Sequence, residues 1–161
     1  MNFRISFWFV IIFSLVSIFA LSCSASKEDV QEFYQAMTDG DHVKIKTLLE
    51  QNPKLGNAKY RDYPIIHYAF CSSVPIPDQL RTVNLLLEHG TSLEGETGRV
   101  CLGCAIMQGD ALLFELLLKH GADPTLKVKS PPRQEEITAL EMAKIYDSKE
   151  IIELIEKYTK K

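Results

Sequence analysis

The sequence has no excess of positive charge and no glycine-rich phosphate loop. Its 161 residues include 18 lysines and arginines against 21 aspartates and glutamates, a net charge of −3, whereas a nucleic-acid-binding domain normally presents a basic face. No Ser–His–Asp set and no paired carboxylates of the kind that nucleophilic and acid–base catalysis use stand out in the sequence. We therefore expect neither nucleic-acid binding nor enzymatic activity, and no cofactor or metal ion.

Charge is also scarce at the N-terminus, where Arg4 is the only charged side chain before Lys27. The apolar run from Ile5 to Leu21 follows it and is interrupted only by serines. A basic start, an apolar run and small residues after it predict an export signal over residues 1–22. The alternative is an uncleaved membrane anchor, because the 17 residues of the run lie at the lower edge of what spans a bilayer.

The stretch Leu21-Ser22-Cys23 resembles the lipobox of bacterial lipoproteins, in which a diacylglycerol is attached to the cysteine. The resemblance implies a lipidated Cys23, a tether over residues 23–29 and a periplasm-facing protein whose only membrane contact is the lipid. Since Ser24 rather than an aspartate follows, it also implies the outer membrane. The match is incomplete at Ala20, where lipoproteins usually have a branched aliphatic residue. Ordinary secretion is the alternative, and it gives a soluble periplasmic protein.

One helical pattern recurs along the rest of the chain. Residues 81–90 and 112–121 share the sequence Leu-Leu-Leu-x-His-Gly, and residues 43–52 share its outline. A shorter helical stretch with a central alanine precedes each segment and recurs once more near the C-terminus. The alanines, 33, 36 and 38 residues apart, are Ala36, Ala69, Ala105 and Ala143. One helix–turn–helix unit is therefore repeated four times.

This unit resembles the ankyrin repeat, and the resemblance covers nearly all of residues 30–161. The first copy has lost its opening turn, whereas the others keep more of the motif. The matching stretches are Gly109-Asp110 and Gly121-Ala-Asp-Pro124 in the third copy, Ile66-His67-Tyr68-Ala69 in the second and Thr138-Ala-Leu-Glu-Met-Ala143 in the fourth. The resemblance implies an all-α solenoid of about four helix–turn–helix repeats, at roughly residues 30–60, 61–95, 96–127 and 128–161.

Packing physics accounts for the pattern. Small alanines in the first helices let neighbouring repeats approach closely, so we expect all four to be buried. Gly90 and Gly121 are expected to end their helices in the left-handed conformation that glycine adopts at little cost. Two loops exceed the repeat length, one around Val74–Asp78 and one over Leu126–Glu136. They either carry binding or reflect tolerated surface drift.

The resemblance also implies a function, since ankyrin proteins hold protein partners with their finger turns and first helices. Tyrosine and arginine often anchor such interfaces, although Tyr63 and Phe70 can equally pack against neighbouring repeats. Carried over residue by residue, the resemblance implies a monomer that binds a protein through Tyr60, Arg61, Tyr63, Phe70, Glu96, Thr97, Arg99, Met107, Gln108, Lys127 and Lys129.

The identity of that partner is open. A small, acidic, tethered binder suits an immunity protein that neutralises a toxin. It also suits a helper of an oxidative-stress enzyme in the cell envelope, because some exported bacterial ankyrin proteins are associated with catalase.

The cysteines and His67 offer further interpretations. Cys101-Leu-Gly-Cys104 has the spacing of a redox motif at a helix start, which gives a thiol-redox protein as an alternative function, although the ankyrin register already explains both positions. Three thiols with His67 could hold zinc, but an exported protein more readily forms a disulfide. The ankyrin register places neighbouring first helices side by side, which favours a Cys71–Cys104 disulfide, with Cys101 as the competing partner. His67 stands where the ankyrin motif has a histidine. In that family this histidine usually forms a hydrogen bond to the backbone of a neighbouring turn.

Overall fold

The computed structural model describes residues 25–71, 76–129 and 136–160. This part of the chain is mostly helical, which confirms the helical class expected from the sequence. Every helix among these residues is too short or too polar to span a bilayer. The predicted signal segment and Cys23 lie outside the described residues.

The described residues form eight α-helices, one 3₁₀ helix and four short strands. The α-helices are α2 (Lys27–Asp39), α3 (His42–Gln51), α4 (Ile65–Cys71), α5 (Gln79–Glu88), α6 (Glu96–Gln108), α7 (Ala111–Lys119), α8 (Ala139–Ile145) and α9 (Lys149–Thr159). The remaining elements are η1 (Pro53–Asn57), β1 (Lys59–Tyr60), β2 (Tyr63–Pro64), β3 (Lys127–Lys129) and β4 (Glu136–Thr138).

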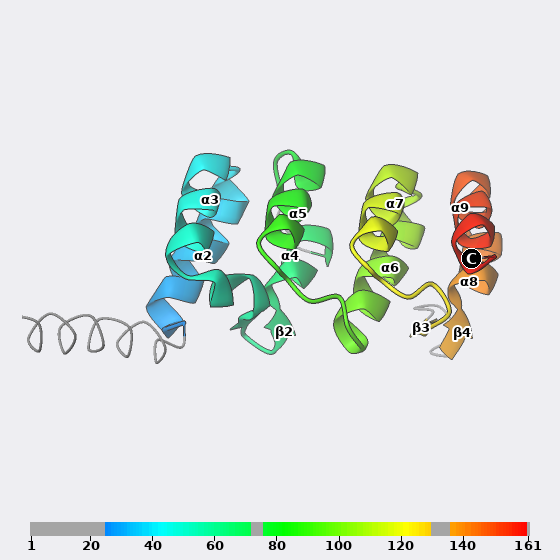
Figure 1. Ribbon diagram of the computed structural model, residues 1–161, viewed down its shortest axis with the longest axis horizontal. Coiled ribbons are helices and arrows are strands. Elements are labelled where there is room, and N and C mark those ends of the chain that lie inside the picture. Colours follow the sequence, from blue (N-terminus) through cyan, green and yellow to red (C-terminus); the bar gives the residue numbers. More distant parts are fainter. Residues whose placement is uncertain (1–24, 72–75, 130–135, 161) are drawn as a thin grey trace, which may run out of the picture.

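The helices form four successive pairs that stand side by side in a row (Figure 1). We call each pair a layer, and the layers are α2–α3, α4–α5, α6–α7 and α8–α9. Helices contact each other within every layer. Between layers, the second helices contact in the order α3, α5, α7 and α9, and the first helices α4, α6 and α8 do the same. Each layer therefore covers apolar surface that a single helix pair would leave bare.

A glycine–aspartate sequence makes the turn inside two of the layers. Gly40 ends α2 with a φ of 68°, and the side chain of Asp41 accepts a backbone hydrogen bond in the first turn of α3. Gly109-Asp110 repeats this arrangement between α6 and α7. Glycine takes the left-handed conformation at little cost, and aspartate satisfies a free N–H of the next helix. The expected positive φ is also found at Gly90 and Gly121.

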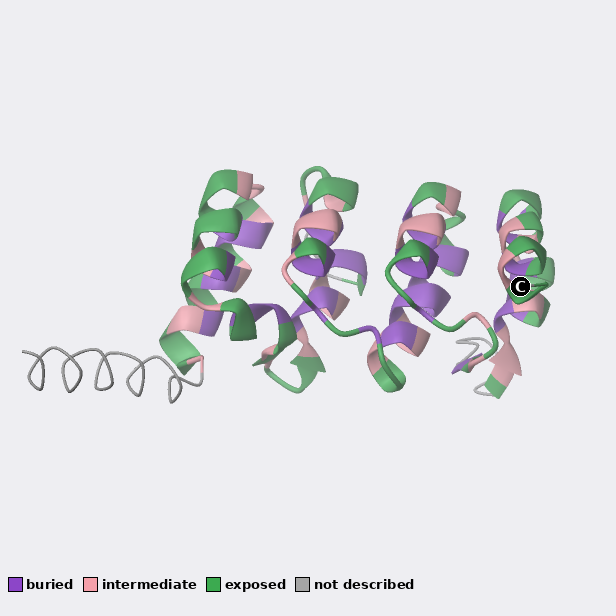
Figure 2. Ribbon diagram, in the orientation of Figure 1, coloured by how far each residue is buried: buried purple, intermediate pink, exposed green. Residues whose placement is uncertain are grey.

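Buried side chains line the contacts within and between layers (Figure 2). The alanines expected in this core are 2% exposed at Ala36, 3% at Ala69 and 0% at Ala105 and Ala143. Each belongs to the first helix of its layer. The prediction of a buried alanine row is therefore confirmed, and a larger side chain at these positions would have to displace closely packed neighbours.

Two antiparallel ribbons lie on one side of the row, along the lower edge of Figure 1. In the first, Tyr60 pairs with Tyr63, and Arg61 at the turn has a φ of 52°. In the second, Val128 pairs with Ile137 and is fully buried, and its strand β3 contacts α6. Of the two long loops noted in the sequence, residues 74–75 and 130–135 lie outside the described part of the chain.

Candidate functional site

A cavity of about 260 Å³, which we call the ribbon cavity, lies between the β1–β2 ribbon and α6. Three of the expected partner-contact residues, Tyr63, Glu96 and Thr97, meet in its lining. Tyr63 keeps 54% of its surface exposed there. The full lining is Lys59, Asp62, Tyr63, Pro64, His67, Glu96, Thr97, Val100 and Cys101. The cavity therefore draws on the second and third layers and combines aromatic, acidic and basic groups.

Stacked aromatic rings hold the β1–β2 ribbon against the first two layers. Tyr34 of α2 stacks on Tyr60, with ring centroids 4.2 Å apart, and Tyr68 of α4 meets both rings edge-on. The Tyr68 hydroxyl donates a 2.8 Å hydrogen bond to the Tyr60 carbonyl oxygen, and burial raises the pKa of Tyr68. Tyr63 stacks on His67 with centroids 4.8 Å apart. These contacts fix the ribbon while leaving much of Tyr63 open to solvent.

The two arginines expected to contact a partner have different surroundings. Arg61 is exposed at the ribbon turn, and its guanidinium carbon lies 5.4 Å from the centroid of the Tyr60 ring. The side chain of Arg99 is only 23% exposed and forms ion pairs with Glu136 at 2.8 Å and with Glu96 at 3.3 Å. Arg99 therefore ties α6 to β4, and Arg61 is the more accessible of the two.

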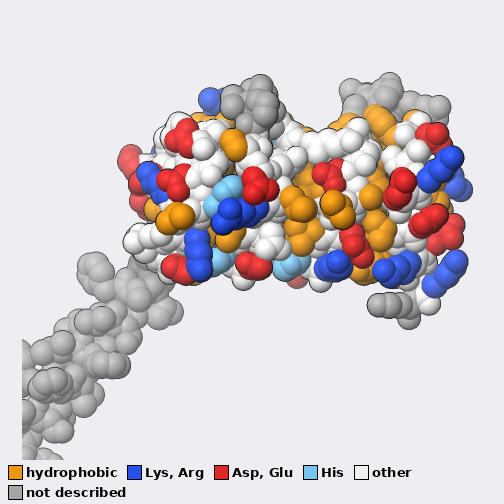
Figure 3. All heavy atoms as spheres, turned by 90° about the horizontal axis from the view of Figure 1, so that it is seen from above, with side chains coloured by type: hydrophobic (Ala, Val, Ile, Leu, Met, Phe, Trp, Pro, Cys, Tyr) orange, Lys and Arg blue, Asp and Glu red, His pale blue; other side chains and the backbone are white. Residues whose placement is uncertain are grey.

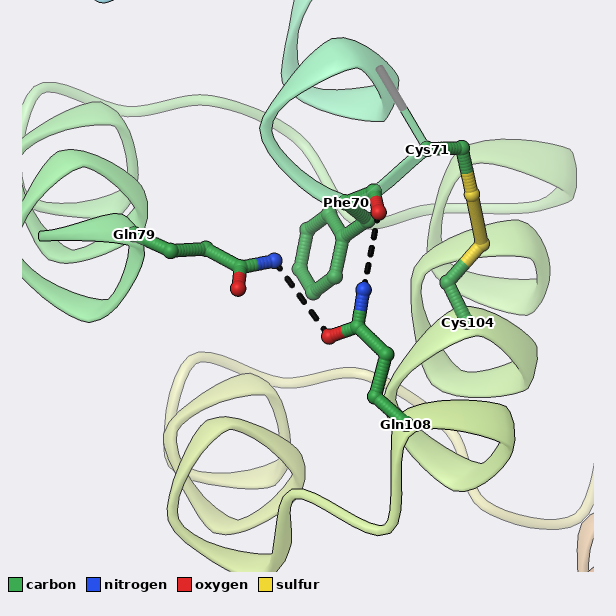
Figure 4. The surroundings of a disulfide bond; sticks show 5 residues. All are labelled: Phe70, Cys71, Gln79, Cys104 and Gln108. Carbon is green, nitrogen blue, oxygen red and sulfur yellow. Dashed lines mark hydrogen bonds between the residues drawn. A yellow bond between two sulfur atoms is a disulfide. The ribbon is translucent and has the colours of Figure 1, made fainter. Parts of the chain in front are cut away.

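Phe70 and Gln108 also make contacts within the chain (Figure 4). Phe70 is 6% exposed and belongs to the core, so it does not offer the surface that was expected of it. The Gln108 Nε2 donates a 2.8 Å hydrogen bond to the Phe70 carbonyl oxygen, and its Oε1 accepts one of 3.4 Å from Gln79. Met107, the other expected contact in this helix, remains 36% exposed.

Two further expected contacts, Lys127 and Lys129, lie on β3 in the second ribbon, and Lys127 is not part of the lining of the ribbon cavity. Lys127 is exposed and pairs in the ladder with Thr138, while Lys129 pairs with Glu136. The expected contact residues therefore do not form one continuous site. Tyr63, Glu96 and Thr97 form a compact group at the ribbon cavity, whereas the two lysines belong to the second ribbon.

A disulfide joins Cys71, the last residue of α4, to Cys104 in α6 (Figure 4). This is the pairing that the sequence favoured over Cys71–Cys101. The bond connects residues 33 positions apart and links the first helices of the second and third layers. It also leaves Cys101 without its motif partner Cys104.

Cys101 lies in an environment that opposes reactivity. Its side chain is fully buried, and burial raises the pKa of the thiol to about 12. Because α6 begins at Glu96, the Cys101-x-x-Cys104 motif lies inside the helix and not at its start as the sequence suggested. The stabilisation of a thiolate by a helix N-terminus is therefore lost at this position. These contacts do not favour the thiol-redox alternative.

The surroundings of His67 differ from those expected. The ankyrin resemblance implied a hydrogen bond to turn backbone, but the buried Nδ1 has no hydrogen-bond partner among the described residues. Burial lowers the pKa of the imidazole below its usual range. A ring nitrogen of His67 and the Sγ atoms of Cys71 and Cys104 lie within 4.8 Å of one another. The His-x-x-x-Cys spacing, about one helical turn, was the sequence signal for this proximity.

A second hollow, which we call the helix groove, lies between α5 and α7. Its volume is about 400 Å³, and Leu80 and Leu112 in its lining are 40% and 68% exposed. The charged side chains in the lining are Asp78, Arg81, Glu115 and Lys119. Figure 3 shows the molecule from above, with hydrophobic side chains gathered toward the middle of that face and charged ones around them. The sequence pattern assigned second helices to packing, so it did not predict this groove.

The ribbon cavity and the helix groove differ in character. The ribbon cavity combines an exposed tyrosine with acidic and basic groups, whereas apolar leucines contribute to the helix groove. The lining of the ribbon cavity includes His67 and Cys101, but the Cys101 thiol is buried and its pKa is raised to about 12, which opposes its use as a nucleophile. No protein-family model matches the chain, and no curated protein matches it in sequence.

Proposed function

We propose that this chain is an ankyrin-repeat protein that acts as a non-catalytic binding module and holds a protein partner at the ribbon cavity. The repeated helix pairs, the buried alanine row and the ribbons on one side of the row support this assignment. The helix pairs and the buried alanine row are features that the repeat pattern in the sequence led us to expect. The proposal does not depend on any catalytic residue.

The exposure of Tyr63 beside the ribbon cavity is the observation that carries the proposal. A tyrosine supplies a large apolar ring and a hydroxyl, and it is among the residues that most often dominate interface energies. Here the ring is held by its stack on His67 yet remains 54% exposed. A ring that is already ordered loses little conformational entropy when a partner covers it.

The size and charge of the ribbon cavity suit a protein side chain better than a cofactor. Pockets for drug-sized ligands typically have volumes of about 300–1,000 Å³, and this cavity has about 260 Å³. Asp62, Glu96 and Lys59 in its lining are all exposed, so acidic and basic groups are both accessible there. We infer that a partner inserts one anchoring side chain here and surrounds it with polar contacts.

The test is affinity capture from the native host, followed by quantitative mass spectrometry. Tyr63→Ala and Arg61→Glu should each reduce the captured partner by at least about tenfold, the effect expected of an interface anchor. Arg81→Glu is the matched control, because it makes the same charge change on the second helix of the same layer. Helical circular dichroism should be unchanged in all three variants.

The outcomes separate the alternatives. Loss of the partner with Arg81→Glu alone would place the interface at the helix groove and overturn the proposal, as would retention of the partner by all variants. The identity of a captured protein distinguishes the partner hypotheses, since an immunity protein should capture a toxin and a stress helper should capture a catalase-like enzyme.

We further propose that the module is exported and tethered to the outer membrane through Cys23, on the sequence evidence given above.

A further inference from the structure

The junction between the second and third layers contains three side chains of a type that binds soft metal ions. His67 and Cys71 are four residues apart on α4 and therefore share one face of the helix. Cys104 reaches the same place from α6, and one ligand atom from each residue lies within 4.8 Å of the other two. Two thiols and an imidazole are a donor set that zinc sites use.

His67 is prepared for such a role. Its ring is held by the stack on Tyr63 and by an edge contact with Tyr68, so its orientation is fixed. The buried Nδ1 has no hydrogen-bond partner among the described residues, which is unusual because buried polar atoms are nearly always paired.

We propose that reduction of the Cys71–Cys104 disulfide creates a Zn²⁺ site formed by His67, Cys71 and Cys104. The two layers would then be cross-linked in either redox state, by a disulfide under oxidising conditions and by a metal ion under reducing ones. The fourth position of the tetrahedral ion would be open to water.

A dithiol reductant, small-molecule or protein, can carry out the reduction step by thiol–disulfide exchange. Its thiolate attacks Sγ of Cys71, which is exposed, whereas Cys104 is only 4% exposed. The sulfur–sulfur bond breaks, and its electron pair leaves on the Cys104 sulfur, which takes up a proton. The second thiol of the reductant then displaces Cys71 as a thiol, and the reductant departs as a disulfide. Two electrons and two protons have been transferred.

Metal binding follows without further redox change. The two thiols lose their protons, and each thiolate forms a zinc–sulfur bond of about 2.3 Å, which separates the sulfurs by about 3.8 Å in a tetrahedron. The complex of Zn²⁺ with two thiolates and a neutral imidazole has no net charge, which suits a partly buried junction. The same ligands around Cu⁺ would leave a net negative charge, so the site favours zinc.

The experiment uses the purified protein, reduced with a phosphine under nitrogen and titrated with Zn²⁺ against a chromophoric chelator. Reduced protein should bind one equivalent, and oxidised protein should not compete with the chelator. His67→Ala should weaken binding at least tenfold, and Cys104→Ser should abolish it. Cys101→Ser is the matched control and should leave the affinity unchanged. With Co²⁺ as a probe, the reduced wild type should show thiolate-to-metal charge-transfer absorption that Cys104→Ser lacks.

Circular dichroism of the reduced protein with and without Zn²⁺ shows whether binding involves the folded layers. The proposal predicts that Zn²⁺ preserves or restores the helical signal and raises the melting temperature. It is overturned if His67→Ala binds as tightly as wild type, if Cys101→Ser abolishes binding, or if zinc binds a reduced chain that stays unfolded. These results do not depend on the identity of the protein partner proposed above.

Discussion

Arg99 in α6 and Glu136 in β4 form an ion pair with a separation of 2.8 Å between Nη1 and Oε1. The pair connects residues 37 positions apart and holds the second ribbon against the third layer. Because the Arg99 side chain is only 23% exposed, solvent screens this pair less than it screens a fully exposed one.

Reversing one charge of this pair should therefore destabilise the fold. Arg99→Glu brings the new carboxylate close to both Glu96 and Glu136, and we expect a loss of about 1 kcal/mol in the free energy of unfolding. The double variant Arg99→Glu with Glu136→Arg should recover part of that loss. Urea denaturation of the wild type, both single variants and the double variant measures the coupling. A loss in the double variant equal to the sum of the losses in the two single variants would show that the two charges do not couple.

Enlarging the central alanine of the third layer should be more costly. Ala105 is fully buried in α6, which packs on α4, α7 and α8. Ala105→Leu should lower the free energy of unfolding by about 1–3 kcal/mol, because a tightly packed core has no room for three extra carbons. Met107→Leu on the same helix is the control, since Met107 is 36% exposed. A neutral effect of Ala105→Leu would contradict the close packing of the layers.

The sequence predicted features that repeat locally, together with the Cys71–Cys104 pair that the repeat register favoured, and it missed single tertiary contacts that the repeat pattern does not contain. The buried alanines and the glycines with positive φ follow from a pattern that recurs in each unit, so the sequence alone was sufficient for them. The ion pair of Arg99 depends on where β4 lies relative to α6, and no local sequence pattern contains that information. The burial of Phe70 was likewise open, because the periodicity of a seven-residue helix is too short to fix its inward face.

The burial of Cys101 predicts a pH dependence of stability. Its pKa is raised from the ordinary value of 9.0 to about 12, so folding favours the neutral thiol. The resulting stabilisation is complete below about pH 9, where the unfolded chain is also protonated, and it is lost as the pH rises toward about 12. Cys101→Ala should therefore show a shallower fall in the free energy of unfolding between these pH values than wild type. Identical slopes in denaturant titrations would refute this assignment.

The proposed tether at Cys23 predicts a change in cellular fraction. Mass spectrometry of the native protein should find an N-terminal cysteine that carries acyl chains, because lipidation requires cleavage directly before it. Cys23→Ala should shift the protein from the membrane fraction to the soluble periplasm. A native soluble species that begins after residue 23 would refute lipidation without affecting the assignment of the helical layers.

Two glycines on α6 should respond to alanine in opposite directions. A Cβ added at Gly98 would collide with the backbone carbonyl of Leu93, and backbone cannot move aside as a side chain can. Among the described residues, a Cβ at Gly103 would meet only the Val128 side chain, at 3.7 Å, which is ordinary van der Waals contact.

Gly103→Ala should therefore raise the free energy of unfolding by about 0.5–1 kcal/mol, since alanine is the better helix former and restricts the unfolded chain. Gly98→Ala should lower it despite the same gain in helix propensity, because the start of α6 must shift away from Leu93. Thermal and urea denaturation of both variants test the pair, with helical circular dichroism to check that each folds. If Gly98→Ala were as stabilising as Gly103→Ala, the close approach of α6 to Leu93 would be incorrect. That outcome would also change the wall of the ribbon cavity, because Glu96 and Thr97 line it from the same turn.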